Sequence, residues 1–273
     1  MKKRKRAKRV ISFLIVLFIA MWFLPVLWLI EASIDSNANV FLKTPDSVTL
    51  DNFRSVVESQ TNQRALINSI LLSCSVAFLV VVCSTMAGYA LSRYKSRASR
   101  GYMLTILFMT TLPGTVLIVP VYKMFNVLRL YDSLLGLSFF LAATSLPYSI
   151  WMMSNFCDGI PIELEEAAEV DGAGAFARLY YVVSPLILPG ICCVAIRAFS
   201  SAWGNFMTPY ILLSSNDKYT ASIMMYKYID AFSISYGGLA AFSILYSLPS
   251  ILLYLISQKF MAQGFVLSGA NKG

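Results

Sequence analysis

Residues 10–30 read VISFLIVLFIAMWFLPVLWLI, an apolar run without a charged side chain. A helix of about 20 such residues is long enough to cross the hydrocarbon core of a bilayer, which is about 30 Å thick. We predict six spans, at about residues 10–30, 67–91, 102–122, 133–156, 184–203 and 238–260, with Pro113 and Pro120 interrupting the third. The sequence therefore predicts an all-α integral membrane protein with six transmembrane helices.

Composition supports this class and excludes several others. Of the 273 residues, 58% are hydrophobic and 13% are charged, whereas a soluble domain is about one-quarter charged. Histidine is absent, which excludes Ser–His catalysis and histidine-containing metal sites. There is no G-x-x-x-x-G-K-[ST] segment to cradle the phosphates of ATP. The five cysteines form no C-x-x-C pair and are odd in number, so no disulfide framework is implied. We expect no catalytic residue, no metal site and no cofactor bound by this chain.

Basic residues indicate the orientation. Residues 1–9 hold seven Lys or Arg directly before the first span, which favours membrane topology over nucleic-acid binding. A secretory signal would have a shorter apolar core, so we expect the first span to be retained. With six spans, the side of the termini carries fourteen basic residues and the other side seven. The positive-inside rule therefore predicts a basic cytoplasmic N-terminus (1–9), a transmembrane domain (10–260) and a cytoplasmic, glycine-containing tail (261–273).

The loop between the fourth and fifth predicted spans is acidic. Six of the fourteen acidic residues lie between Asp158 and Asp171. Early glutamates favour a helix N-terminus, and Gly172 or Gly174 can end such a helix. We predict a short helix there, with Pro161 at its first turn, and a second helix at about residues 176–183. The residues alone fit two interpretations: a helix that docks on a soluble partner, with Glu166 meeting a basic residue, or a solvated amphipathic loop.

Residues 166–185, EAAEVDGAGAFARLYYVVSP, resemble the EAA signature of ABC-importer permeases, which is EAA, three residues, Gly, nine residues, then I-x-L-P. Val182 for Ile is a mild change, and Ser184 stands where the signature has Leu. The segments AGYALSRYK, LPGTVLIVPVYKMFNVLRLYDSLLGL and QKFMAQGFVLSGANKG are similar to the sugar-importer permeases. They point to the second subunit of the maltose-type pair.

The resemblance implies the type I ABC importer permease fold, with residues 157–183 as a cytoplasmic coupling loop held in a cleft of an ATPase. Coupling roles would fall on Glu163, Glu166, Ala167, Ala168, Asp171, Gly172 and Pro185. The implied partners are a second homologous permease subunit in a heterodimer, two ATPase subunits that bind ATP and Mg, an extracytoplasmic sugar-binding protein and membrane lipid. The implied location is the cell (inner) membrane of a bacterium or archaeon, with both termini cytoplasmic.

The substrate path is less constrained by the residues. Arg197 is the one ionisable residue deep in a predicted span. It fits either a pore or subunit contact, because intramembrane charge usually faces a cavity or partner, or a side chain that snorkels to the interface. Trp203, Asn205 and Tyr210 fit sugar contacts, and Trp203 and Tyr210 fit an interfacial aromatic belt as well.

Three alternatives to a sugar importer follow from the sequence. A permease for peptides or amino acids would carry the same EAA loop. An ion-coupled secondary transporter would be expected to show inverted repeats and broken helices near the midplane, and no convincing inverted repeat is present. A membrane enzyme would need a nucleophile–base pair or a metal constellation, which the sequence lacks.

Overall fold

The computed structural model describes residues 2–45, 47–111, 114–229 and 234–269, and within these ranges the chain is helical apart from turns, loops and two isolated β-bridges. Among the described residues, four helices are long and apolar enough to cross a membrane, or up to six if each of two bent helix pairs counts as one span. This confirms the all-α membrane class. The chain groups into two compact units, residues 1–63 with 224–248, and residues 64–223 with 249–273.

The first unit begins with the long helix α1 (Lys2–Ile34) and the short helix α2 (Asp51–Glu58). None of the most apolar window of α1 is buried inside the chain. Beyond α1 the loop is held by polar bonds: Asp35 is buried and pairs with Lys43 at 3.2 Å, and Asn52 Nδ2 donates to the Ser33 and Asp35 carbonyls. The segment between α1 and α2 is therefore partly ordered by Asp35, Lys43 and Asn52, while Asp46 in this segment lies outside the described residues.

The second unit holds most of the helices. They are α3 (Gln60–Arg93), α4 (Arg97–Met109), η1 (Gly114–Leu117), α5 (Ile118–Val127), α6 (Leu134–Asp158), α7 (Glu163–Val170), α8 (Ala175–Ala177), η2 (Arg178–Val183), α9 (Ser184–Leu186), α10 (Leu188–Trp203), α11 (Met207–Leu212), η3 (Asn216–Lys218), α12 (Ala221–Lys227) and α13 (Tyr236–Gly269), with α3, α12 and α13 contributing to both units. Helix α13 continues to Gly269, into the segment assigned above to a tail, and residues 270–273 lie outside the described part.

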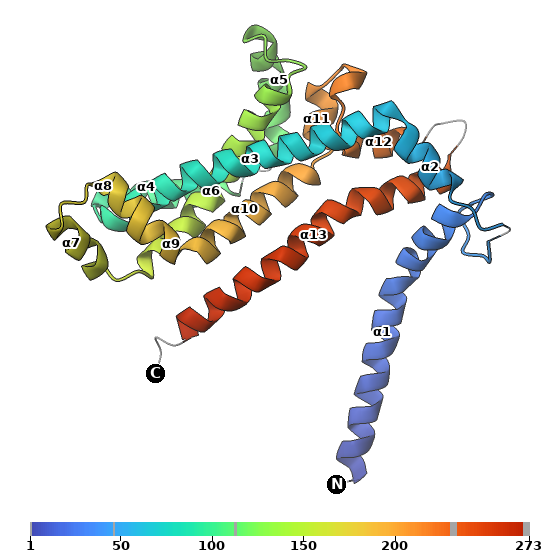
Figure 1. Cartoon of the computed structure of the whole chain (residues 1–273), viewed down its shortest axis with the longest axis horizontal. Helices are drawn as coiled ribbons and strands as arrows, with labels where there is room; N and C mark the ends of the chain where they lie inside the picture. Colours follow the sequence, from blue (N-terminus) through green and yellow to red (C-terminus); the bar gives the residue numbers. More distant parts are fainter. Residues whose placement is uncertain (1, 46, 112–113, 230–233, 270–273) are drawn as a thin grey trace. The chain divides into compact units, whose positions relative to one another are not determined.

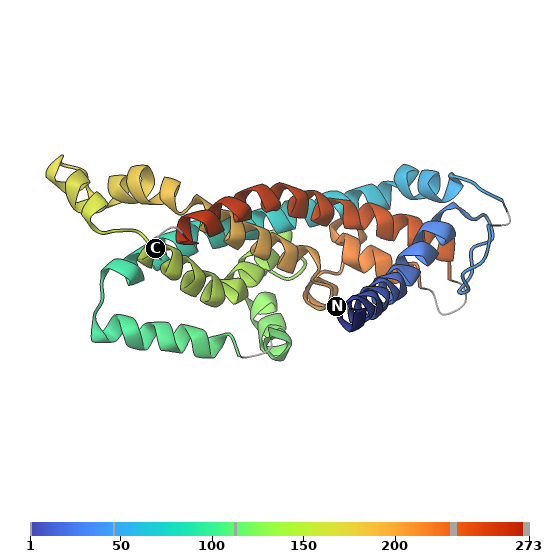
Figure 2. The same cartoon turned by 90° about the horizontal axis from the view of Figure 1, so that it is seen from below.

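Helices α3, α6 and α10 pack around a shared apolar core in this second unit. Fully buried members of the core include Val80 on α3, Met153 on α6 and Val194 on α10. Helices α7 and α8 (yellow) lie at one end of this bundle, and α5 and α11 lie away from that end (Figure 1). The view from below shows the same separation (Figure 2). The bundle therefore presents two distinct ends, on which the candidate sites are found.

Glycine permits a close approach between α3 and α6. An added Cβ at Gly88 of α3 would lie 2.8 Å from Met153 Cβ and 2.8 Å from the Ser154 backbone nitrogen on α6. Small residues at such crossings let membrane helices approach closely. This contact fixes the spacing of α3 and α6 near the α7 end of the bundle.

Two predicted spans are bent rather than straight. The chain turns by 85° between residues 101–109 and 114–127, but Pro120 does not interrupt α5, because it lies in its first turn, where no backbone N–H is needed. Pro113 lies outside the described residues. The second bend, of 83°, separates residues 175–186 from α10. Pro189 cannot donate to the carbonyl of Pro185, four residues earlier. The fifth predicted span is therefore broken at Ile187, between the helical stretch that holds Ser184 and α10.

Candidate functional site

Helix α7 is the acidic helix expected from the sequence, and its end is shaped by glycine. Three glutamates lie in its first turn, where negative charge is favourable to the helix dipole. Gly172 has φ +85°, its N–H donates to Glu169 O at 2.9 Å, and the Ala173 N–H donates to Ala168 O at 2.9 Å. These two bonds form a Schellman motif with Asp171 as the C-cap residue. The start was predicted less well, since Pro161 precedes the helix instead of lying in its first turn.

Most of the predicted coupling residues are exposed to solvent. Glu163, Glu166 and Ala167 are exposed on α7, Ala168 is half-buried, and Asp171 and Gly172 are exposed at its end. Val170, the last residue of the helix, is 88% exposed. Small alanines beside free carboxylates leave a low-relief acidic surface that a basic groove on another protein could contact closely.

One acidic side chain of α7 has the opposite environment. Glu165 is 3% exposed, and its carboxylate accepts a hydrogen bond from Tyr89 Oη at 2.6 Å and forms an ion pair with Arg93 at 2.6 Å. Tyr89 and Arg93 are one helical turn apart at the end of α3, so both side chains project from the same face. A buried carboxylate needs partners of this kind, because an unpaired buried charge is costly. These three residues, which we call the clasp, join α7 to α3.

Further polar bonds surround the clasp. Arg93 also donates to the Ile160 carbonyl at 3.3 Å and to Ser92 Oγ at 3.2 Å. Ser92 Oγ donates to Asp158 at 2.8 Å, and Lys95 lies 3.6 Å from the same carboxylate. The guanidinium of Arg93 is thus bonded on several sides, to the helix that carries it, to the chain before α7 and to α7 itself.

The predicted second helix is present, with an unexpected geometry in its middle. Residues 175–186 are helical, and η2 is a π-helix. Ser184 Oγ donates to the Leu179 carbonyl, five residues earlier, at 2.7 Å. A serine in place of the signature leucine therefore satisfies a carbonyl in the wider turn. Pro185 is exposed beside it.

This second half of the loop also exposes aromatic surface. Phe176, Tyr180 and Tyr181 are 71%, 64% and 75% exposed. Arg178 forms an ion pair with Glu169 of α7, which ties the two halves of the loop together. A cavity of about 300 Å³ lies between α7, the end of α3 and Arg178. Its lining combines the clasp with exposed acidic side chains of α7, so its rim is negatively charged on the α7 side.

The predicted substrate-path residues are placed separately. Arg197 lies inside α10, is exposed in this chain, and its guanidinium carbon is 4.1 Å from the centroid of the Tyr148 ring. Trp203 is 3% exposed and stacks on Phe199, so it is a packing residue within this chain.

The other two path candidates lie beyond the end of α10. Asn205 Oδ1 accepts from the Thr208 N–H at 3.1 Å, which caps the start of α11. Tyr210 is 48% exposed and stacks on Phe206. Of the four candidates, Arg197 and Tyr210 therefore present exposed side chains to a solute or a partner.

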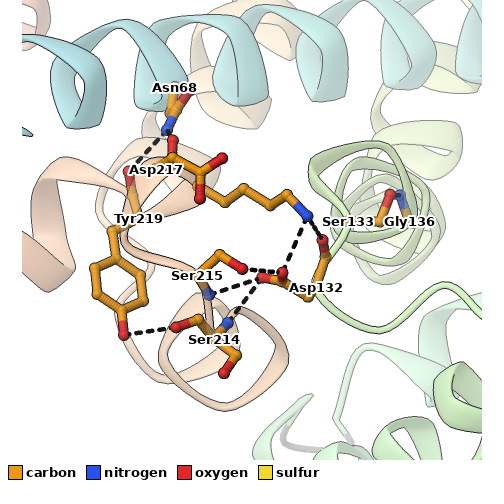
Figure 3. Close-up of polar contacts among 9 residues, drawn as sticks. Asn68, Asp132, Ser133, Gly136, Ser214, Ser215, Asp217 and Tyr219 are labelled. Carbon is orange, nitrogen blue, oxygen red and sulfur yellow. Dashed lines mark hydrogen bonds and ion pairs between the residues drawn. The ribbon is translucent and has the colours of Figure 1, made fainter.

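Another polar cluster, at the end of the bundle away from α7, is centred on Asp132 (Figure 3). Its carboxylate accepts from the Ser214 and Ser215 N–H groups at 2.9 and 3.1 Å, from Ser215 Oγ at 2.5 Å and from Lys218 Nζ at 3.0 Å. Asn68 of α3 donates to the Asp217 and Tyr219 carbonyls in the same loop. The loops before α6 and after α11 are therefore locked to each other.

The cluster also controls the charge of Asp132. Its backbone is left-handed, with φ +56°, a conformation that Asp tolerates better than most residues. Burial alone would raise the pKa of this carboxyl, but hydrogen bonds from Ser215, Ser214 and Lys218 outweigh burial and hold the pKa well below its ordinary value. The carboxylate is therefore charged throughout the physiological range.

Sequence reasoning missed the clasp and the Asp132 cluster. The signal for the clasp was a Tyr and an Arg spaced four residues apart at the end of an apolar run, opposite an acidic loop. The signal for Asp132 was an acidic residue directly before a span, within the LYDS segment. Both sequence patterns are short, and neither indicates which distant residue completes the site.

The fold and these loops define a class: the chain has the fold of an ABC importer permease. A solved bacterial ABC transporter involved in the import of the acidic polysaccharide alginate contains a chain that matches with a TM-score of 0.84 at 20% identity, over 95% of this chain and 98% of that one. Residues 60–266 match the binding-protein-dependent transport system inner membrane component family, and the protein belongs to this family.

Two similar permeases are named for the sugars that they transport. The chain is 31% identical to the trehalose transport system permease protein SugB of Mycobacterium tuberculosis over 92% of both chains. It is 27% identical to the arabinooligosaccharides transport system permease protein AraQ of Halalkalibacterium halodurans, over 96% of this chain and 95% of that one. Both matches cover nearly the whole length of this chain and of the named permeases.

Proposed function

We propose that this protein is a permease subunit of an ATP-driven sugar importer, and that α7 is its contact with a partner ATPase. The observation that carries the proposal is the division of acids on α7: Glu165 is turned into the bundle, while Glu163 and Glu166 face outward beside small alanines. A solvated loop helix has no need of a buried anchor. A helix that must bear load from a partner on its outer face does need one.

The sugar assignment rests on the relatives. Two permeases that align with almost the whole chain are named for trehalose and for arabinooligosaccharides. The family name implies a binding protein that delivers the solute. We infer that this chain forms one half of the path and a second, homologous permease forms the other. The most apolar window of α1 is not buried in this chain. We expect this surface to contact the second permease subunit and lipid.

The proposed mechanism uses two conformations whose populations depend on the nucleotide bound by the ATPases. ATP and Mg bind to the ATPase subunits, and their closure moves α7. The outward glutamates, Glu166 above all, anchor α7 in the ATPase by charge-assisted bonds. Alanines permit close approach, and Gly172 ends the helix at the required turn. We place this loop and both termini on the cytoplasmic side of the cell membrane.

The test is copurification and uptake. The untagged importer should contain this chain, a second permease and two ATPase copies, and a strain lacking this chain should fail to take up a labelled sugar that the intact strain imports. Glu166→Lys should abolish ATPase association or uptake, because it reverses a charge at the docking surface. Glu58→Lys reverses an exposed acid on α2 and is the matched control.

Three outcomes would refute parts of the proposal. Uptake of peptides or amino acids, but not of sugars, would keep the coupling role and reject the substrate class. Uptake driven by an ion gradient without ATP would reject the importer class. Unchanged association and uptake in Glu166→Lys would reject α7 as the contact.

A further inference from the structure

We propose that the clasp of Tyr89, Arg93 and Glu165 is the element that transmits movement of α7 to span α3, so that these three are positioning residues for coupling. This inference rests on the proposed function, because it presupposes that an ATPase moves α7. It assigns a role to residues that lie behind the docking surface and would not touch the ATPase.

The first argument is that apolar packing does little to hold α7 on the bundle. The helix has eight residues, and Glu165 is the one buried among them. The large apolar side chains of α7, Leu164 and Val170, are 46% and 88% exposed. Apolar packing therefore contributes little to fixing α7 on the bundle, and a force on its outer face would reach α3 mainly through the bonds of Glu165.

The second argument is geometric. Each carboxylate oxygen of Glu165 has its own partner: Oε1 accepts from Arg93 Nε at 2.6 Å and Oε2 accepts from Tyr89 Oη at 2.6 Å. Arg93 is in turn fixed by the Ile160 carbonyl and by Ser92. Because a planar guanidinium bonded in several directions cannot rotate freely, the clasp holds both the distance and the orientation of α7 relative to the end of α3.

The third argument concerns why the contact is ionic. A buried ion pair adds little net stability compared with apolar residues of the same size, but it holds a directional geometry. Clasp variants should therefore separate stability from coupling. Replacing both charges by neutral amides removes the ion pair and the multiply bonded guanidinium without leaving one charge unpaired.

The experiment uses the complete importer in liposomes, with ATP hydrolysis and solute uptake measured on the same sample. In the double variant Arg93→Gln/Glu165→Gln, we expect the complex to assemble and hydrolyse ATP while uptake per ATP falls at least about fivefold, the lower end of usual coupling between sites. Lys95→Gln removes a neighbouring exposed ion pair and should leave the ratio unchanged. An unchanged ratio in the double variant would overturn the inference.

A second measurement does not depend on the double variant folding. Spin labels at Tyr94 and Val170, both exposed, report the distance between the end of α3 and α7 in the otherwise unaltered importer. We expect one distance distribution with and without ATP, because the clasp moves the two ends together. A nucleotide-dependent change would overturn the inference. Failure of the wild-type complex to couple ATP to uptake would instead reject the proposed function.

Discussion

Replacing Gly88 by alanine tests the packing of α3 against α6. The new Cβ would meet the Met153 Cβ at 2.8 Å, the Ser154 nitrogen at 2.8 Å and the Met153 carbonyl carbon at 3.1 Å. Two of these three atoms are backbone atoms and cannot rotate away. Contact at about 3.5–4.0 Å is the favourable separation, so the helices must part by roughly 0.7 Å or more at this point.

The cost can be estimated from two opposing effects. Overpacking of this kind costs about 1–3 kcal/mol, and alanine returns up to about 1 kcal/mol of helix propensity. With the full propensity gain subtracted, we expect Gly88→Ala to lower the free energy of unfolding by up to about 2 kcal/mol. Gly101, inside α4, has nothing within 4 Å of its added Cβ, so Gly101→Ala receives the propensity gain alone.

The assay is reversible denaturant unfolding of the purified subunit in detergent micelles, comparing both variants with wild type. Gly88→Ala should unfold at lower denaturant and Gly101→Ala at the same or higher denaturant. The difference between the two alanine variants isolates the packing cost, since helix propensity acts on both. If Gly88→Ala proved as stable as Gly101→Ala, the close approach of α3 and α6 described above would be wrong.

Three further predictions concern the loops and α10. Asp132→Asn should lower the free energy of unfolding by about 1.5–3 kcal/mol at pH 7, the usual contribution of hydrogen bonds to a charged group. Because the pKa of Asp132 in the folded state is depressed below the unfolded value of about 3.9, this difference from wild type should be constant above about pH 5 and shrink as the pH falls below about 4. It should vanish below the folded pKa, as measured by unfolding at each pH. Gly172→Ala places a side chain at φ +85° and should cost about 1–2 kcal/mol, seen as faster protease nicking of the loop, whereas Gly174→Ala should not. Arg197→Gln should leave the unfolding midpoint nearly unchanged, since an exposed cation–π contact with Tyr148 is worth about 0.5–1 kcal/mol, but should lower uptake.

The acidic helix was predictable because its determinants are local. Glutamates at a helix start, alanines within it and glycine after it act through neighbouring residues, and Gly172 has the left-handed backbone that such an end requires. Which glutamate is buried was not predictable. In a helix of two turns each of several faces could point inward, and the choice of Glu165 is made by Arg93, far away in the sequence.

The spans were also predictable where they depend on composition, but a break within one of them was not. Long apolar runs predicted α1, α3, α6 and α13 because burial in a bilayer depends on composition over about 20 residues. The break before α10 depends instead on the Pro185–Pro189 spacing and on the helical geometry of the residues before it. A hydropathy pattern averages over such a break, which is why the break at Ile187 inside the expected span was not predicted.

The loop is attached to the bundle in two different ways, and this bears on how it could carry force. On one side, α7 meets α3 through the clasp, whose bonds are directional but separable. On the other side, the helical stretch of residues 175–186 leads through a single break at Ile187 into α10, and Ser184 closes the wide turn of η2 with a bond to Leu179. Ile187 is 1% exposed and belongs to the apolar core, so this connection is covalent and packed.

If an ATPase moves α7, the two attachments would make α3 and α10 move at the same time. The ion pair between Arg178 and Glu169 would keep the two halves of the loop from bending relative to each other. A subunit with the clasp broken would then still move α10, which predicts partial rather than complete loss of uptake in the clasp variants.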